Sequence, residues 1–471
     1  MQTIYVTALA QPMSQIFNAI AEFYKPGGGW ISAQSIFMML SAVGVIVMVM
    51  MMRNSKPIMP WIMGITIVPF ILSSPKTSVN IVNMTQPLEA YQVDNVPSGL
   101  AVPISIISGI AYGFQTTLTK VYHTPQDRDY NQTGMMFGSE LFKELSHLHP
   151  NYKTQAVLDG YMGNCVLTDI EIRHKYTYQE LFNSPNIVDF LKEHATKDTF
   201  DKVDMHDGTL NKPNLITCED ALPKIKEMLY KNVDAAKYQL AASLSHSIKH
   251  PIEQSKIMNA ISNVSAAYFN GYSISAKDTL VQNMFARGVQ NGLLNNSVAH
   301  GAGASLNYAY TKAQMSSTAQ NLTAGMLAQK YIPQLQTILF MLLVAVFPIM
   351  VFVMMLPGMS MKLAKSYGYS LVWVNLWSIF YIVLNFISHA ILESHINQLF
   401  GSGTTPGYTL NALDPINNSI TEYASVTGYL MMSIPFISMM VTKPLSEVMG
   451  NMATSFMNRM ASNTHQASEY A

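Results

Sequence analysis

Charge is scarce in this chain: only 12% of its 471 residues are charged, and 28 basic residues balance 28 acidic ones. A neutral chain without a basic stripe is not typical of a protein that binds nucleic acid phosphates. The sequence also lacks a G-x-x-x-x-G-K-S/T phosphate loop, so we do not expect it to drive a process by its own nucleotide hydrolysis. Apolar residues make up 49% of the chain, which predicts membrane-spanning segments.

The few charges are concentrated in the middle of the chain. The segment Gln115–Tyr331 holds 20 basic and 20 acidic residues, which leaves 8 of each for the rest. This distribution predicts an α-helical, polytopic membrane protein with a large, mostly helical domain outside the membrane. We divide the chain into an amphipathic amino-terminal segment (1–29), a transmembrane hairpin (30–74), the helical domain (75–330), a second transmembrane region (331–442) and a tail (443–471).

Five uncharged segments are predicted to cross the membrane, because each approaches or exceeds the length of about 20 residues that a spanning helix needs. They are Ser32–Met52, Pro57–Ser73, Tyr331–Leu356, Tyr367–Leu392 and Val426–Val441. Prolines are expected to kink the second span, and Pro348 and Pro435 are expected to break the third and the fifth.

The basic residues near these spans predict the orientation, because Lys and Arg in short loops stay on the cytoplasmic side. Those residues are Arg53 and Lys56, Lys362 and Lys365, and Lys443. The loop Glu393–Ser425 has no Lys or Arg. The amino terminus and the helical domain are therefore expected on the outer side.

Val96–Phe114 is a further uncharged run of 19 residues. If it crossed, the helical domain would become cytoplasmic and the loop with Lys362 and Lys365 would move outward, against the basic bias. We therefore interpret it as a helix that lies on the membrane edge or re-enters it.

The amino terminus has no basic residue before Lys25 and no continuous apolar core, so it does not resemble a cleaved signal peptide. Its apolar residues recur at helical spacing: Leu9, Met13, Ile16, Phe17, Ile20, Phe23 and Tyr24. This amphipathic helix is expected either on the outer membrane surface or packed on the protein's own spans.

Cysteine is nearly absent. Cys165 and Cys218 are the only two, and both fall in the domain placed outside. In an oxidising compartment they are expected to form a disulfide, the alternative being two separate buried thiols.

Within the domain, apolar spacing is mostly helical. Residues 200–213 resemble a polar loop, and 241–277 resemble helices broken at His250-Pro251 and near Gly271. Residues 305–330 are expected to form a helical stalk that runs into the third span.

Candidate chemistry is limited to a few polar residues. His147 with His149, and His246 with His250, have spacings that can bind metal, but no further ligand motif accompanies them, so we assign no metal and no cofactor. Asn385 and His389 lie one turn apart in the fourth span, where such groups face a partner helix or an aqueous path.

One motif is highly specific. It is Y-x-V-D-N-V-P-x-G-L-A-x-P, with Tyr91, Val93, Asp94, Asn95, Val96, Pro97, Gly99, Leu100, Ala101 and Pro103. Further motifs are Thr133, Gly134, Met135, Phe137 and Gly138; Asn164-Cys165 with Asp169 and His174-Lys175-Tyr176-Thr177; Ile216-Thr217-Cys218; Gln336-Thr337-Ile338; Phe347-Pro348; Thr427-Gly428-Tyr429-Leu430; and Ile434-Pro435. Together these motifs resemble the amino-terminal region of the TraG proteins of F-type conjugation systems.

This resemblance implies a multi-pass inner-membrane component of a conjugative type IV secretion apparatus, needed for pilus assembly and mating-pair stabilisation. Its implied partners are other inner-membrane, core-complex and pilus proteins, with membrane lipid and further copies of itself. F-type TraG proteins continue into a long carboxy-terminal region linked to exclusion, and the present sequence stops at Ala471, so exclusion is not assigned here.

Our leading hypothesis is a non-enzymatic scaffold and channel subunit whose domain is periplasmic. One alternative is a membrane transporter or periplasmic enzyme that uses Asn385 and His389 or the paired histidines, and another is a structural receptor without a conduit. Direct DNA contact is left open. Asp94 and Asn95 are expected either to have a special role or to cap the helix that follows them.

Overall fold

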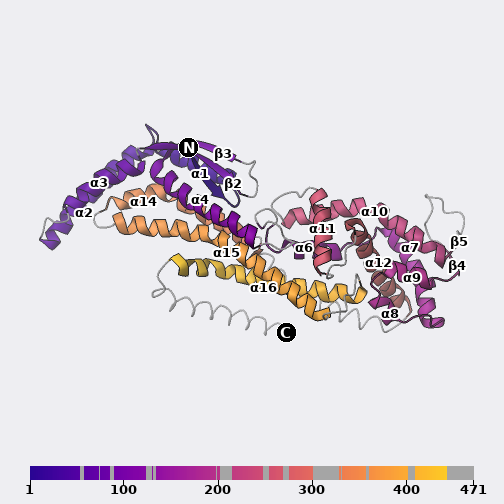
Figure 1. Cartoon of the computed structure of the whole chain (residues 1–471). Helices are drawn as coiled ribbons and strands as arrows, with labels where there is room; N and C mark the ends of the chain where they lie inside the picture. Colours follow the sequence, from indigo (N-terminus) through magenta and orange to yellow (C-terminus); the bar gives the residue numbers. More distant parts are fainter. Residues whose placement is uncertain are drawn as a thin grey trace. The chain divides into compact units, whose positions relative to one another are not determined.

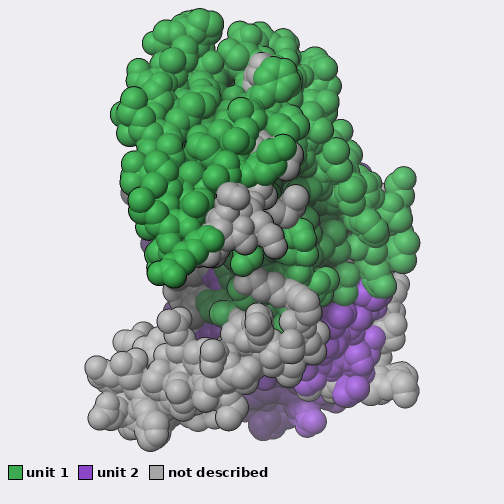
Figure 2. Space-filling view, turned by 90° about the vertical axis from the view of Figure 1, so that its left-hand side faces the viewer, with its two compact units in different colours: residues 1–122, 330–384, 430–471 green, residues 123–329, 385–429 purple. Residues whose placement is uncertain are grey.

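The structure is a computed structural model, and it is largely α-helical (Figure 1). It describes residues 1–53, 58–73, 75–84, 90–122, 130, 134–197, 199–201, 215–247, 254–268, 275–300, 328–329, 331–356, 360–400 and 409–442. The chain forms two compact units (Figure 2): unit 1 comprises 1–122, 330–384 and 430–471, and unit 2 comprises 123–329 and 385–429. Residues 76–122, which the sequence analysis assigned to the helical domain, thus belong to the same unit as the amino terminus.

Unit 1 contains a three-stranded sheet that the sequence analysis missed. Its strands are β1 (Gln2–Val6), β2 (Lys76–Asn83) and β3 (Ala90–Pro97), in the order β1-β2-β3. β1 pairs in parallel with β2, so that Ile4 lies opposite Ile81, and β2 pairs antiparallel with β3, so that Val79 lies opposite Val93. The alternation of buried Val79, Ile81 and Asn83 was the available signal.

The pairing of β1 with β2 has a topological consequence. Strands that exchange backbone hydrogen bonds must lie in the same compartment, because an open sheet cannot cross the hydrocarbon layer. The amino terminus and the segment that follows α3 (Ile58–Ser73) are therefore on one side of the membrane. It follows that α2 (Gly29–Met52) and α3 together cross an even number of times.

The predicted amphipathic helix is present as α1 (Ala10–Phe23). Its apolar face is buried within the protein: Met13 and Phe17 belong to one core cluster with Val93 of the sheet and Phe340 of the helix Tyr331–Ala345. The structure therefore favours packing on the protein's own spans over an apolar face in contact with lipid.

Among the residues that the structure describes, four helices are long and apolar enough to cross a membrane: 29–51 of α2, α4 (Ser98–Val121), 362–398 of α15 (Ser360–Phe400) and α16 (Leu410–Thr442). The helix Tyr331–Ala345 and α14 (Phe347–Met354) form a pair bent by 43°, which brings the count to five if the pair is one span. The fold is thus that of an α-helical, polytopic membrane protein. The apolar part of α3 is shorter, Gly64–Ser73.

The ends and bends of the spans agree with the sequence at one proline and differ at two other places. Pro348 lies in the first turn of α14, directly after the bend, as predicted. Pro435 does not break its span, because α16 continues through it to Thr442. The predicted loop Glu393–Ser425 is also wrong, since α15 extends to Phe400 and α16 begins at Leu410.

The remaining described elements of unit 2 are helices and one short strand pair. They are α6 (Phe137–Ser146), α7 (Tyr152–Tyr161), the π-helices η1 (Met162–Val166) and η2 (Thr168–Ile172), α8 (Tyr178–Asn183), α9 (Ile187–His194), β4 (Thr199–Asp201), β5 (Leu215–Thr217), α10 (Cys218–Ser247), α11 (Gln254–Tyr268) and α12 (Ala276–His300). In 241–277 the structure describes the end of α10, the helix α11 and the start of α12. Residues 202–214, His250-Pro251, Gly271, most of the stalk 305–330 and the tail 443–471 lie outside the described residues.

Candidate functional site

The Y-x-V-D-N-V-P motif forms β3 and the turn into α4. Asn95 has a left-handed backbone conformation (φ 62°), which asparagine tolerates better than most residues, beside an irregularity in the pairing with Thr77 and Val79. The Asp94 carboxylate accepts hydrogen bonds from Ser78 and from Gln92 Nε2 (3.1 Å), and these bonds lower the pKa of Asp94. The predicted capping role of Asp94 or Asn95 is wrong, because Pro97 is the N-cap of α4 and no side chain caps it.

The second half of the motif joins α4 to the end of α3. Ser98 donates both its backbone N–H and its hydroxyl to the Pro75 carbonyl, each at 2.7 Å. Gly99 lies against the main chain of Leu72, so that a Cβ atom on Gly99 would be 2.5 Å from Leu72 Cα. Only glycine fits this approach without moving backbone, which explains the glycine of the motif.

Two serines of α4 cover the outer edge of the sheet. Ser105 Oγ donates to the Thr3 carbonyl (2.8 Å), and the Tyr5 backbone N–H donates to Ser108 Oγ (3.3 Å). The rings of Tyr5 and Tyr112 stack with their centroids 4.1 Å apart. α4 therefore satisfies two backbone groups of β1, the Thr3 carbonyl and the Tyr5 N–H, that an edge strand would leave open. Sequence reasoning missed these serines, although their spacing of three on an apolar helix was visible.

The T-G-M-x-F-G motif lies at the start of α6 and contacts α15. Gly134 and Met136 have positive φ angles (90° and 51°), so the chain turns sharply before the helix. The backbone N–H of Met136 donates to Asn385 Oδ1 at 2.7 Å, in a buried position. Phe137 and Gly138 are buried in α6, and Thr133 lies outside the described residues. Asn385 thus binds a backbone group of the α6 turn in unit 2, and the sequence analysis had expected a partner helix or an aqueous path.

His389 follows Asn385 by one turn on α15 and is 1% exposed. In unit 1, Pro435 provides a contact between spans, because its carbonyl accepts the Trp373 indole N–H at 2.8 Å. The polar and kinked positions of the spans therefore take part in helix packing.

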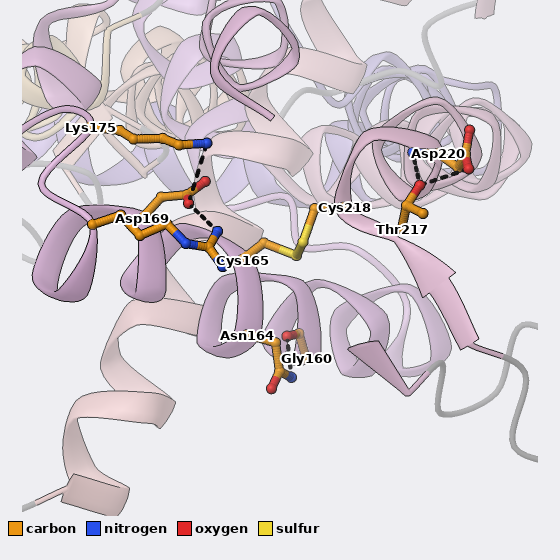
Figure 3. The surroundings of a disulfide bond; sticks show 9 residues. Gly160, Asn164, Cys165, Asp169, Lys175, Thr217, Cys218 and Asp220 are labelled. Carbon is orange, nitrogen blue, oxygen red and sulfur yellow. Dashed lines mark hydrogen bonds and ion pairs between the residues drawn. A yellow bond between two sulfur atoms is a disulfide. The ribbon is translucent and has the colours of Figure 1, made fainter. Parts of the chain in front are cut away.

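The disulfide Cys165–Cys218 joins η1 to the first residue of α10 (Figure 3), with the Cα atoms 5.9 Å apart. Close to it, the buried Asp169 carboxylate pairs with Arg173 (2.8 Å) and Lys175 (3.7 Å), as Figure 3 shows for Lys175. The two cysteines thus tie the segment around Asp169 to the long helix α10.

The H-K-Y-T run has a structural role at each position. His174 has a left-handed backbone conformation (φ 51°), which ends η2. The Lys175 ammonium group forms the ion pair with the Asp169 carboxylate. Burial raises the pKa of Tyr176, and the nearby Tyr161 and Asp169 raise it further. Thr177 forms a capping box with Glu180 at the start of α8.

In the part of the chain that the structure describes, His147 and His149 do not belong to a metal-binding cluster. Asn291 Nδ2 and His149 Nδ1 are 3.4 Å apart, and His147 ends α6. Burial, with the cations Arg287 and Lys143 nearby, lowers the pKa of His147. Among the described residues, no group of three or more His, Cys, Asp or Glu could hold a metal ion. His250 lies outside the described residues, so the pair with His246 stays untested.

Taken together, the motif residues set turns, close approaches and helix ends over almost the whole chain. The family model described as TraG-like protein, N-terminal region, matches residues 3–468. The chain belongs to the TraG-like family. Protein TraG of Escherichia coli (strain K12) is 26% identical over 476 residues, which cover 99% of this chain and 48% of that protein. The chain thus spans about half the length of the TraG protein that it matches. No solved structure matches the chain.

Proposed function

We propose that this TraG-like chain is an inner-membrane scaffold and channel subunit of a conjugative type IV secretion system. It acts in pilus assembly, mating-pair stabilisation and DNA transfer, and the domain formed by 123–329 docks onto other components in the periplasm. The family match and the apolar helices support a conjugation protein of the membrane.

The observation that carries the non-enzymatic part of this proposal is how the motif residues are used. Asn95, Gly99, Gly134 and His174 set backbone conformations or close approaches, and Asp169 forms ion pairs. Such structural roles are expected of the motif residues of a scaffold, whereas the motif residues of an enzyme would converge on a shared cavity.

The disulfide supports the periplasmic orientation, and the sheet supports a hairpin that crosses the membrane and returns. A disulfide persists in an oxidising compartment, and its cysteines lie in the 123–329 segment. The parallel pairing of β1 with β2 keeps the amino terminus and the exit of α3 together, as the basic residues of the loops also predict.

The test is a donor strain whose chain lacks residues 123–329 but retains the apolar helices. We expect loss of pilus extension and of plasmid transfer, with membrane insertion preserved. Immunoblotting of the membrane fraction is the control for insertion. Normal transfer by this variant would refute the docking role.

The transporter or enzyme alternative is tested separately with His147→Gln and His149→Gln. A scaffold should keep its transfer frequency, because neither side chain joins a described cluster of metal-binding groups. A loss of transfer with normal folding would favour the alternative.

A further inference from the structure

A groove of about 350 Å³ lies between the unit 2 parts of α15 and α16. Along α15 it is lined by apolar Ile387, Ala390 and Ile391 and then, one to two turns further on, by polar side chains. The polar side chains are those of Ser394, His395 and Gln398. The groove therefore has an apolar end and a polar end, in that order along the helix.

Tyr423 of α16 provides the opposite wall, with its ring centroid 5.2 Å from that of His395. From Ile387 to Gln398 the groove runs for about 16 Å at the helical rise of about 1.5 Å per residue. Its volume falls in the range of about 300–1,000 Å³ that is usual for ligand sites.

The place of the groove on α15 relates it to the membrane. The uncharged run of α15 begins after Lys365, and 22 residues separate Lys365 from Ile387. That distance corresponds to about 33 Å of helix, close to the hydrocarbon thickness of about 30 Å. The groove thus begins where the span reaches the surface opposite to Lys365, with its apolar end nearer to the hydrocarbon.

The apolar end is open. Ile387 is 44% exposed and Ile391 is 47% exposed. Two exposed isoleucines that continue a spanning segment are favourable when hydrocarbon covers them. The hydroxyl, imidazole and carboxamide groups at the other end offer donors to an anionic or ester oxygen.

We propose that this groove binds one phospholipid of the leaflet opposite to Lys365. An acyl chain lies along Ile387 and Ile391, and the headgroup phosphate accepts hydrogen bonds from His395 and Gln398. The acids Glu393 and Glu422 neighbour lining residues in sequence and disfavour a net negative headgroup. The lipid is therefore an amine-bearing, zwitterionic one of the phosphatidylethanolamine type.

The test uses the full chain, purified in detergent and equilibrated with mixed vesicles of phosphatidylethanolamine and phosphatidylglycerol. Retained lipid is then counted by mass spectrometry. The wild type should retain phosphatidylethanolamine in preference, and Ala390→Trp, which fills the groove, should lower its retention about tenfold, the equivalent of about 1.4 kcal/mol.

Ile437→Trp is the control, because it introduces the same indole side chain at an exposed position of α16 in unit 1. It should leave retention unchanged. Where Ala390→Trp fails to fold, Gln398→Leu tests the headgroup end and should reduce the preference for phosphatidylethanolamine. Equal retention by Ala390→Trp and Ile437→Trp, or a preference for phosphatidylglycerol, would overturn the proposal. The assay requires only that α15 spans the membrane, so its result is independent of any role in conjugation.

Discussion

The backbone N–H of Met136 donates a hydrogen bond to the carboxamide oxygen of Asn385, 249 residues further along the chain, at 2.7 Å. This bond places the turn before α6 on α15. It also joins two features that the sequence shows separately, the T-G-M-x-F-G motif and a polar residue in an apolar helix.

Asn385→Leu should destabilise unit 2. The substitution leaves the buried Met136 N–H without its acceptor, which costs about 1–3 kcal/mol. Limited proteolysis of the purified protein should show faster cleavage between residues 134 and 146. Asn385→Asp keeps an acceptor oxygen and should be milder. Asn375→Leu is the matched control, because Asn375 Nδ2 donates to the Leu371 carbonyl of its own helix. Equal sensitivity of both leucine variants would argue against the Met136 contact.

Gly99→Ala should destabilise unit 1 by about 1–3 kcal/mol, because the new methyl group meets the Leu72 main chain. Gly109→Ala lies on the same helix with nothing within 4 Å of its Cβ position. It should be neutral or more stable by up to about 1 kcal/mol. Thermal unfolding in detergent compares the two, and a reversed order would contradict the close approach.

Removal of the disulfide by Cys165→Ala with Cys218→Ala should destabilise unit 2. The bond closes a loop across a sequence separation of 53, which is worth about 4 kcal/mol in the chain-entropy model. Thermal unfolding of the double variant should match that of the reduced wild type. An unchanged midpoint in both would show that the crosslink contributes little.

The orientation can be measured by thiol labelling in intact cells with a maleimide that does not cross the inner membrane. The native cysteines are paired and buried, so single cysteines are introduced at Tyr152→Cys, where the side chain is 88% exposed, and at Arg53→Cys. We expect labelling of the first in intact cells and of the second only after lysis. Labelling of both cysteines only after lysis would place unit 2 in the cytoplasm and make α4 a true span, and labelling of Arg53→Cys alone in intact cells would invert the predicted orientation of the chain.

Acidification should destabilise unit 2 through His147. Its pKa is lowered in the folded state by burial and by Arg287 and Lys143, so the unfolded chain binds a proton first as the pH falls below about 6.5. Above that pH His147 is neutral in both states and does not lower the free energy of unfolding. Below it, the free energy of unfolding declines until the pH reaches the pKa of His147 in the folded state. His147→Gln should show a smaller loss of unfolding temperature between pH 7.5 and pH 5.5 than the wild type. An identical loss would assign the acid sensitivity to other groups.

Part of the site could be anticipated from local pattern. The two cysteines, the polar residues in apolar runs and the motif glycines all stood out, because composition and spacing mark them. Their partners did not, since nothing in the local sequence links Gly99 to Leu72, Ser105 to Thr3 or Asn385 to Met136. Local sequence favoured capping by Asp94. In the structure, β3 pairs irregularly at this point, and the Asp94 carboxylate instead accepts hydrogen bonds from Ser78 and Gln92.

The sequence by itself determined the membrane character, the apolar helices, the helical nature of the central segment and the family, because hydropathy, charge and motifs are properties of neighbouring residues. Only the tertiary structure decided that residues 2–6 form a sheet with 76–83 and 90–97, that α15 and α16 extend past their apolar runs, and that α1 packs inside the protein. The physical reason is that strand pairing and helix packing depend on contacts between distant segments, and such contacts override local preference.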